Sequence, residues 1–378
     1  MPTKTCALVE RLQTIPDPRR QCENLKHPLV DIIMLGFCGV LAGCEDFVEI
    51  AEWGKEHETV LGTFLELPHG SPSHDTVNRV FAVLSPSTLQ EVLLPWLVER
   101  RGLPGEFVHL DGKTLRATRC KSQKLKALHV VSAWAGQTGL TLGQVAVDTK
   151  SNEITALPQL LDLLDLQDKI VTIDAMGCQT DLARAIVVGG GDYVLAVKGN
   201  QPTLHGELQA AFAQAPAPKL RSSRQTTTFD KGHGRYEQRT VEVLPAREYL
   251  SAAQQALWVG VVSLVMVTCT VWEQAAGRQS TEVRYFLSSL PPVARRLGAA
   301  IRGHWNIENG LHWVLDVVFR DDARRVYDRT TAENVAFMHR LALSLLRGDT
   351  GKSSLKVKRK RAGWSMAYLM QLLGFSST

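Results

Sequence analysis

Residues 302–322 read RGHWNIENGLHWVLDVVFRDD and predict a half-buried helix that carries one central carboxylate, Glu308. Apolar residues recur in this stretch close to the 3.6-residue period of an amphipathic helix. Four polar residues spaced four apart would share a second line along such a helix: His304, Glu308, His312 and Asp316. An acid flanked by two histidines is an unusual way to build a helix, so we looked for its partners upstream.

Two further carboxylates occupy equivalent places earlier in the chain. Asp111 follows the strand-like run FVHL, and Asp174 follows the run IVTI. Each aspartate would therefore emerge at the end of a buried strand, where α/β sheets usually place their chemistry. Asp316, Asp321 and Asp322 lie further along the helix, and we interpret them as structural or peripheral.

The three acids predict a site for hard divalent cations. Mg²⁺ and Mn²⁺ prefer oxygen ligands and take few of them from protein. Two strand-end aspartates and a helix glutamate can hold two such ions, about 3.5–4 Å apart, around a phosphodiester. Taken singly, each acid has another explanation. A strand-end Asp commonly caps a turn, and Glu308 could be a surface acid that pairs with a neighbouring His or Arg. Their order along the chain favours a two-ion site on Asp111, Asp174 and Glu308.

The segments around these acids predict a mixed α/β protein. Residues 1–101 read as a small all-helical N-terminal domain, in which Ser73 is a candidate helix N-cap. Residues 102–200 read β-β-β-α-β-α-β, which predicts three antiparallel strands and then parallel strands joined by helical crossovers. Residues 201–290 read as a β-rich insertion, and the α/β pattern resumes over residues 291–346.

The two ends of the chain leave alternatives open. Residues 347–378 predict a basic C-terminal tail and a short helix, because residues 347–361 hold seven Lys or Arg against one Asp. A solvated tail and a phosphate-binding segment explain this run equally well. In the N-terminal domain, the helix after Ser73 carries Asn78 and Arg79 on its polar side. It could enter a DNA groove or simply pack against its neighbours.

The composition is that of a globular protein with weak basic character. Of 378 residues, 44% are hydrophobic and 21% are charged, with a formal net charge of +5. This balance excludes a disordered chain and is compatible with nucleic acid without requiring it. The seven cysteines include no CxxC pair and the first twenty residues hold no signal-peptide core, so we expect a reducing, cytoplasmic location. The longest apolar run, residues 259–269, is too short to span a membrane and predicts a buried strand.

Seven longer motifs resemble the DDE transposases of bacterial insertion sequences, in the H-repeat-associated (Rhs-linked, ISAs-type) branch. The motifs are VHLDGKTLRAT, ALHVVSAWA, VDTKSNEI, VTIDAMGCQT, DYVLAVKGNQ, DKGHGRYEQR and GHWNIENGLHWVLDVVFRDDARR. The resemblance runs from Asp17 through Leu346. It implies a ribonuclease-H-like catalytic domain with the β-rich insertion before the third acid, and a DNA-end-binding N-terminal domain. Asp111, Asp174 and Glu308 fall on the family's catalytic triad.

The same resemblance implies an activity and its partners. Members of the family cut double-stranded DNA at the element ends with Mg²⁺ and join the exposed 3′-hydroxyls to target DNA. They usually work as dimers on paired ends, so we expect a homodimer on DNA, associated with the bacterial nucleoid and with no membrane partner.

The sequence departs from the family around the glutamate. The broader group places a Tyr, an Arg and a Lys there, whereas this chain has Ile301, His304 and Leu315 at those positions. The missing phosphate contacts need replacements. The candidates are His304, His312, Arg302 and Arg320.

Candidate DNA contacts surround the predicted site. Lys113 and Arg116 follow Asp111, and we favour phosphate binding over a merely charged turn. Lys198 and Asn200 end a strand at the same sheet edge, where a simple turn is an equally good explanation. A glycine-rich hairpin tip in the insertion could reach along the DNA backbone. The full set is Lys113, Arg116, Lys198, Asn200, Lys231, His233, Arg235, Arg302, His304 and His312.

Two other functions stay open beside transposition. A ribonuclease-H-fold nuclease would cut DNA without joining it to a target. An inactive remnant of a mobile element would bind DNA without cutting it, although the intact triad argues against that alternative.

Overall fold

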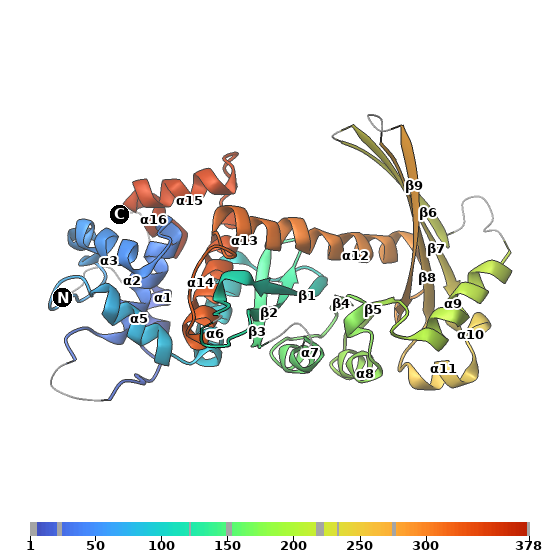
Figure 1. The fold of residues 1–378 in the computed structure, drawn as a ribbon, viewed down its shortest axis with the longest axis horizontal. Coiled ribbons are helices and arrows are strands. Elements are labelled where there is room, and N and C mark those ends of the chain that lie inside the picture. Colours follow the sequence, from blue (N-terminus) through green and yellow to red (C-terminus); the bar gives the residue numbers. More distant parts are fainter. Residues whose placement is uncertain are drawn as a thin grey trace.

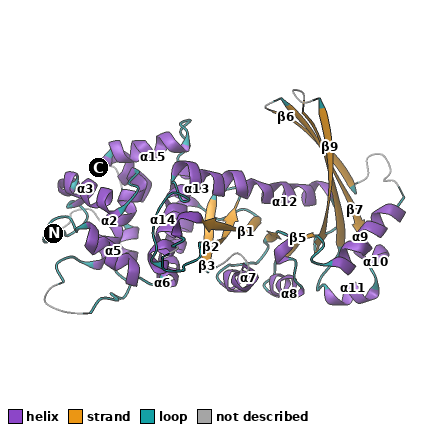
Figure 2. Ribbon diagram, viewed as in Figure 1, coloured by secondary structure: helices purple, strands orange, loops and turns teal. Residues whose placement is uncertain are grey.

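One mixed β-sheet runs through most of the protein. The computed structural model describes residues 6–20, 25–120, 122–148, 153–216, 223–232, 234–273 and 277–375. The sheet has nine strands in the order β3-β2-β1-β4-β5-β9-β8-β7-β6. Helices gather at one end of the molecule and the long insertion strands at the other (Figures 1 and 2).

The first five strands form the catalytic-type half of the sheet. They are β1 (Phe107–Leu115), β2 (Leu128–Ala135), β3 (Leu140–Val147), β4 (Ile170–Ile173) and β5 (Asp192–Val197). The first three pair antiparallel, and β4 pairs parallel with both β1 and β5. Helices α7 (Glu153–Asp162) and α8 (Thr180–Val188) make the crossovers. The predicted β-β-β-α-β-α-β order and the mixed α/β, ribonuclease-H-like class are confirmed.

The insertion widens this same sheet. After α9 (Pro202–Gln214) come β6 (Gln225–Gly232), β7 (Arg235–Pro245), the short helices α10 (Ala246–Tyr249) and α11 (Ala252–Leu257), β8 (Ser263–Glu273) and β9 (Arg278–Ser288). Strand β9 pairs antiparallel with β5, so the insertion continues the sheet edge to edge. The outer ends of β6–β9 project beyond the body of the molecule (Figure 1).

Helices from both ends of the chain share one hydrophobic core. The N-terminal helices are α1 (Ala7–Leu12), α2 (Leu29–Ala42), α3 (Phe47–Glu56), α4 (Glu58–Leu61), α5 (His74–Val83) and α6 (Pro86–Arg101). The C-terminal ones are α14 (Arg329–Gly348), α15 (Leu355–Trp364) and α16 (Met366–Leu373). Their apolar side chains form one cluster, so the N-terminal region is completed by the C-terminus.

This shared core changes the interpretation of both chain ends. The run 347–361 is no solvated tail, because most of it lies in α15 and in the last residues of α14. Ser73 caps α5 as predicted, since its hydroxyl accepts from the Thr76 amide. Helix α5 buries Val77, Val80 and Phe81 and leaves Asn78 and Arg79 exposed, so it packs against its neighbours and keeps a free polar face.

The predicted helix 302–322 is interrupted at its centre. It consists of α12 (Ala294–Ile307), a π-helical turn over Glu308–His312, and α13 (Trp313–Val318). A π turn holds an extra residue compared with an α turn. The straight line predicted for His304, Glu308, His312 and Asp316 is therefore wrong, because the two halves of that line are rotated relative to each other.

Among the described residues, no single helix is both long and apolar enough to cross a membrane. Only α5 and α6 taken together reach that length, and they meet at an angle of 96°.

Candidate active site

Asp111 and Asp174 lie side by side at the end of a parallel strand pair. The pairing of β1 with β4 stops at Leu110 and Ile173, and the two aspartates are the next residue on each strand. The prediction that the strand ends at Asp111 is wrong, because β1 continues to Leu115. It does so by pairing with β2 alone, where Asp111 stands opposite Ser132.

The turn after Asp174 is held rigid by its neighbours. One carboxylate oxygen of Asp174 accepts from the amides of Met176 (3.0 Å) and Gly177 (3.4 Å). The side-chain amide of Asn200 donates to the carbonyl oxygen of Ala175 at 2.6 Å. The Asn200 side chain, predicted to contact DNA, therefore braces this turn.

Glu308 lines the same large cleft as the two aspartates. It begins the π turn and is exposed, and it lines with Asp111 and Asp174 a cleft of about 1130 Å³. The other wall of the cleft comes from the insertion strands β7, β8 and β9. The structure thus brings the three predicted acids to one concave surface.

Negative charge is concentrated around Asp111. Burial is the main cause that raises the pKa of its carboxyl to about 7, and the nearby carboxylates of Glu153, Asp174 and Glu308 contribute to the same rise. The backbone amide of Gly112 only partly opposes this shift. The site has an excess of anionic oxygens that a cation would offset.

His304 belongs to a buried chain of hydrogen bonds beneath the cleft. Its Nδ1 lies 2.9 Å from the hydroxyl of Thr172, and that hydroxyl lies 2.7 Å from Nδ1 of His109. Burial lowers the pKa of His304 to about 4 and that of His109 to about 3. Both rings are therefore neutral at neutral pH, and His304 cannot supply the positive charge of the arginine that it replaces.

His312 and Lys113 flank Asp111 on its other side. Nδ1 of His312 lies 3.5 Å from a carboxylate oxygen of Asp111. Burial lowers the pKa of His312 to about 3, so this ring is neutral as well. The Lys113 ammonium is largely buried and pairs with Asp316 at 2.6 Å and with Asp322 at 3.5 Å. As placed, Lys113 secures α13 to β1 and is not free for phosphate.

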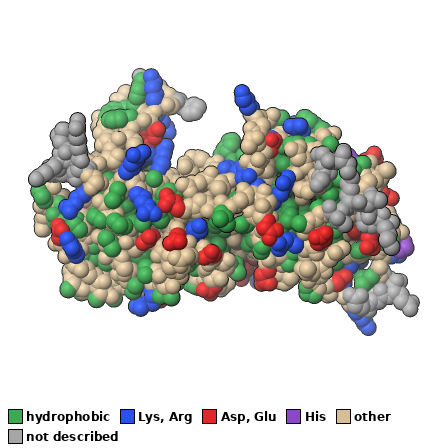
Figure 3. Space-filling model, turned by 180° about the vertical axis from the view of Figure 1, so that it is seen from behind, with side chains coloured by type: hydrophobic (Ala, Val, Ile, Leu, Met, Phe, Trp, Pro, Cys, Tyr) green, Lys and Arg blue, Asp and Glu red, His purple; other side chains and the backbone are tan. Residues whose placement is uncertain are grey.

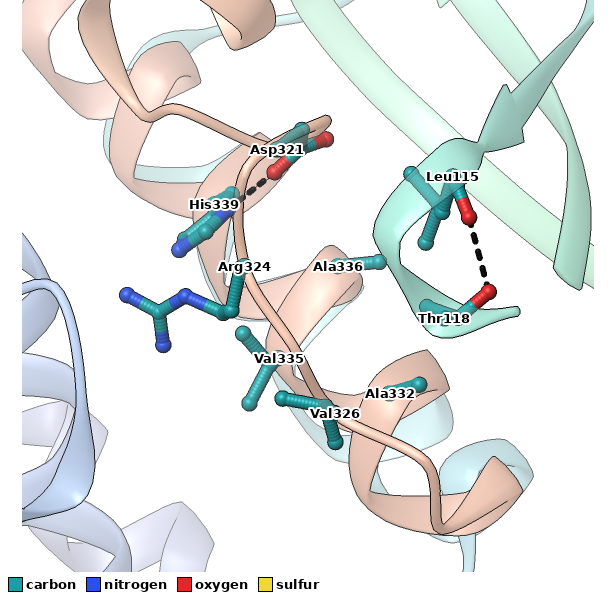
Figure 4. Close-up of a pocket in the computed structure, with 9 residues that line it drawn as sticks. All are labelled: Leu115, Thr118, Asp321, Arg324, Val326, Ala332, Val335, Ala336 and His339. Carbon is teal, nitrogen blue, oxygen red and sulfur yellow. Dashed lines mark hydrogen bonds and ion pairs between the residues drawn. The ribbon is translucent and has the colours of Figure 1, made fainter. Parts of the chain in front are cut away.

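The acids after Glu308 have the structural roles that the sequence predicted. Asp321 is buried and hydrogen-bonds His339 of α14 beside a small cavity that Arg324 also lines (Figure 4). Asp322 accepts from the backbone amide of Arg116 at 3.2 Å and lies 3.4 Å from Nε of that side chain. These contacts fasten the segment after α13 to α14 and β1.

The other predicted DNA contacts differ in how free they are. Lys198 is exposed at the rim of the cleft after β5. Arg302 reaches from α12 to Asp230 of β6 (3.0 Å), and Arg235 pairs with Glu273 of β8 (3.0 Å). The remaining members are Arg116, 82% exposed, and Lys231, whose ammonium lies 4.9 Å from the Tyr236 ring centre. His233 lies outside the described residues.

Two arginines lie deeper in the cleft: Arg239, which belongs to the predicted glycine-rich hairpin segment, and Arg284, which was not predicted as a contact. The guanidinium groups of Arg239 and Arg284 lie 4.6 Å and 4.5 Å from the ring centre of Trp305. Such cation–π contacts hold the indole in place and concentrate positive charge opposite the acids. The alternation of Arg235, Glu237 and Arg239 along β7 places all three on the cleft side. That period-two pattern was the available sequence signal.

A buried His–Glu pair beside Asp111 was also missed. Nε2 of His129 lies 3.0 Å from a carboxylate oxygen of Glu153, and both side chains are almost fully buried. The pair explains the glycine after Asp111, because a Cβ at Gly112 would lie 2.1 Å from Nε2 of His129. Glu153 follows the motif KSN at the start of α7, so only a turn-and-cap role was visible in the sequence.

The donor set fits hard divalent cations. Asp111, Asp174 and Glu308 supply carboxylate oxygens, and no thiolate among the described residues lines the acidic wall. Nδ1 of His304 is already hydrogen-bonded to Thr172, and Nδ1 of His312 lies 3.5 Å from Asp111. Among the described residues, no three acidic, histidine or cysteine side chains lie close enough to hold an ion as they stand. An ion would therefore draw the exposed Glu308 toward the two aspartates.

The chain belongs to the DDE transposase family. Residues 103–345 match the family described as "Transposase DDE domain", and residues 9–97 match the one described as "DDE_Tnp_1-associated". One relative is the Escherichia coli K12 protein named "H repeat-associated putative transposase YhhI". It is 36% identical over 98% of both chains. The protein named "Putative transposase YncI" of E. coli O157:H7 is also 36% identical, over 98% of this chain and 95% of its own.

One solved structure aligns with the whole chain at low similarity. A piggyBac transposase synaptic complex with hairpin DNA aligns over 100% of this chain and 81% of its own, at 11% sequence identity and a TM-score of 0.44.

Proposed function

We propose that this protein is the transposase of an insertion sequence, which cuts DNA at terminal inverted repeats and joins the freed ends to target DNA. The observation that carries the proposal is the placement of Asp111 and Asp174 directly past the last residues that pair β1 with β4, with Glu308 lining the same cleft. Membership of the DDE transposase family supports it.

Asp111, Asp174 and Glu308 would hold two Mg²⁺ or Mn²⁺ ions. When bound, the ions would polarise the attacking oxygen and offset the charge on the leaving oxygen. Asp174 needs little rearrangement, because one of its oxygens is already fixed by backbone amides. His312 lies against Asp111 as a neutral partner and would orient that carboxylate without competing as a cation.

Cleavage and joining each form one bond from phosphorus to an incoming oxygen and break one bond from phosphorus to a 3′-oxygen. In cleavage, a water oxygen bonds to phosphorus at the element end, the bond to the 3′-oxygen breaks, and that oxygen leaves as a 3′-hydroxyl. In joining, this hydroxyl oxygen bonds to a target phosphorus and displaces the target strand's own 3′-oxygen. Lys198, Arg239 and Arg284 would bind flanking phosphates along the basic wall of the cleft.

Cleavage and joining can be tested on the protein's own DNA. Duplexes carrying the inverted repeats that flank the coding region would be incubated with Mg²⁺ or Mn²⁺ and a target plasmid. We expect cut ends and joined products from the wild type, and neither from the Asp111→Ala, Asp174→Ala and Glu308→Ala variants. Asp181→Ala, at an exposed position in the first turn of α8, is the matched control.

Each other outcome identifies an alternative. Cleavage that survives all three substitutions would overturn the assignment of the site. Cut ends without joined product would identify a nuclease, and tight binding without cleavage would identify an inactive remnant. Joining of two ends needs two active sites, so we also propose a homodimer on DNA. Its mass in light scattering should correspond to two chains.

A further inference from the structure

We infer that helix α15 forms a second DNA-binding surface. It would bind the duplex backbone near the end of α13, at the end of α12 that lies away from the insertion strands. The inference rests on the proposed function and adds a contact that none of the cleft residues provides. It concerns the exposed face of α15, defined here as Lys356, Lys360 and Trp364.

Two basic residues of α15 fix how the helix is oriented. The Arg359 guanidinium is buried and donates to the carbonyl oxygens of Val40 (3.1 Å), Val318 (2.5 Å) and Cys44 (3.3 Å). The Lys358 ammonium, also buried, donates to the carbonyl oxygen of Asp349. These bonds join α15 to α2 and to the end of α13. The opposite side of α15 must therefore face solvent.

The solvent side carries positive charge without compensation. Lys356, Lys360 and Trp364 are spaced four residues apart, so they form one stripe on the helix. All three are exposed, Trp364 at 75%. Within the part of the chain that the structure describes, the ion pair formed by α15 is that of Lys358 with Asp349, and neither Lys356 nor Lys360 has an acidic partner.

The charge is placed where a folded helix disfavours it. Lys356 lies in the first turn of α15, which contains no acidic residue. The amide groups of a helix N-terminus carry partial positive charge, so a cation there is unfavourable and an anion is favourable. A bound phosphate would relieve this repulsion, whereas a surface with no partner would retain it.

The position of α15 matches a duplex that also reaches the cleft. Figure 1 shows α15 and the outer ends of β6–β9 rising on the same side of α12, one near each end. Figure 3, seen from behind, shows a hollow between the two raised ends, with Lys and Arg side chains on both. Duplex DNA carries about one negative charge per 1.7 Å of its axis, and this linear charge is what a row of lysines and a facing arginine wall fit.

The test measures how DNA binding depends on salt. A fluorescein-labelled 30-bp duplex of arbitrary sequence would be titrated with full-length protein in 50–300 mM NaCl. Each lost phosphate contact lowers the slope of log K against log[salt] by about 1. We therefore expect Lys356→Gln/Lys360→Gln to lower the slope by about 2 and to weaken binding at 100 mM NaCl by roughly tenfold.

Two matched variants separate a contact from a change in net charge. Arg184→Gln/Arg247→Gln removes the same charge from exposed positions in α8 and α10, on the other side of the molecule (Figure 1), and should keep the wild-type slope. The Lys356→Arg/Lys360→Arg variant keeps the charge and should have the wild-type salt slope. In the Trp364→Phe variant, DNA should quench the protein's tryptophan fluorescence less than it does in the wild type.

The outcomes distinguish this inference from the proposed function. A wild-type slope in Lys356→Gln/Lys360→Gln, or an equal fall in the Arg184→Gln/Arg247→Gln control, would overturn the role of α15 alone. Failure of the wild type to bind the duplex at 50 mM NaCl would overturn both. The Asp111→Asn variant should lose cleavage and keep the wild-type slope, which shows that the two sites act separately.

Discussion

The two walls of the cleft are built in opposite ways. The acidic wall belongs to the buried half of the sheet, where Asp111 and Asp174 follow strands whose residues are almost all inaccessible to solvent. The basic wall belongs to the insertion, whose strand β9 is exposed over its outer half and whose Arg235 and Arg239 pair with Glu273 and Glu237.

This difference indicates that the two walls of the cleft have separate functions. Burial in the rigid sheet, together with repulsion from the neighbouring carboxylates, raises the pKa of Asp111. Such a wall is suited to holding cations in a fixed geometry. Arg235 and Arg284 lie on exposed or half-exposed parts of the insertion strands, where ion pairs are weak and easily exchanged for phosphate. Arg239 is buried between Glu237 and Trp305. We therefore expect the acidic wall to control turnover and the basic wall to control DNA binding.

The largest effect should come from removing one charge on the acidic wall. We expect Glu308→Gln to lower the rate of metal-dependent cleavage by on the order of 10³-fold or more, because the ligand set is incomplete. Its affinity for duplex DNA should stay equal or rise slightly, because one repulsive charge is gone. Single-turnover cleavage and anisotropy on the same protein would measure both. A large loss of affinity would contradict the proposed separation of functions.

The next effect should come from the deep arginines of the basic wall. We expect Arg239→Gln/Arg284→Gln to weaken duplex binding by roughly 10–100-fold and to lower the salt slope by about 2. Cleavage at saturating DNA should fall by less than about tenfold, because the ion ligands are intact. An equal fall in cleavage at saturation would mean that these arginines also contact the reacting phosphate.

A third effect concerns stability and its dependence on pH. The pKa of Asp111 is about 7 in the folded protein and 3.8 for an unperturbed carboxyl. Between these values the folded state holds a proton that the unfolded state releases, so the free energy of unfolding falls as pH rises from about 4 to 7. Asp111→Asn removes this penalty. We expect it to be more stable by on the order of 1–4 kcal/mol at pH 8 in EDTA, and to match the wild type near pH 3.

Melting curves with Mg²⁺ sharpen this comparison. The ion should raise the melting temperature of the wild type at pH 8, since it binds the folded state only, and should have little effect on Asp111→Asn. Equal stabilisation of both proteins would place the ion elsewhere.

The smallest effect should come from the rim. Lys198 is exposed and lines the cleft at its edge. We expect Lys198→Gln to weaken DNA binding by only a few-fold and to lower the salt slope by about 1, with unchanged cleavage at saturation. No change in slope would remove Lys198 from the path of the DNA.

The order of elements and the cleft's three acids were predictable from the sequence because they follow from local pattern. Apolar runs followed by Asp identify β4 and the first part of β1, and periodicity identifies the helix with Glu308. The sequence could not predict which side chains from distant parts of the chain contact one another. Lys113 looked free after Asp111, yet Asp316 and Asp322, about 200 residues later, enclose its ammonium. Arg239 and Arg284 lie on different strands and meet only at Trp305.

The basic run near the C-terminus shows the same limit in another form. Seven Lys or Arg in fifteen residues left a solvated and a phosphate-binding segment equally open, and the five of them that lie in α15 are divided between two faces of that helix. Lys358 and Arg359 are buried against backbone carbonyls, while Lys356 and Lys360 face outward. Composition alone does not separate these roles.

The π turn at Glu308–His312 has a consequence for how this protein can tolerate changes in length. A π turn accommodates one extra residue within a single turn, so deleting that residue would restore regular α-helix and leave α13 in nearly the same orientation relative to α12. Straightening the turn without a deletion would instead rotate α13 by about 100°, and Lys113 would lose Asp316. A chain one residue shorter here should therefore still assemble its helical end.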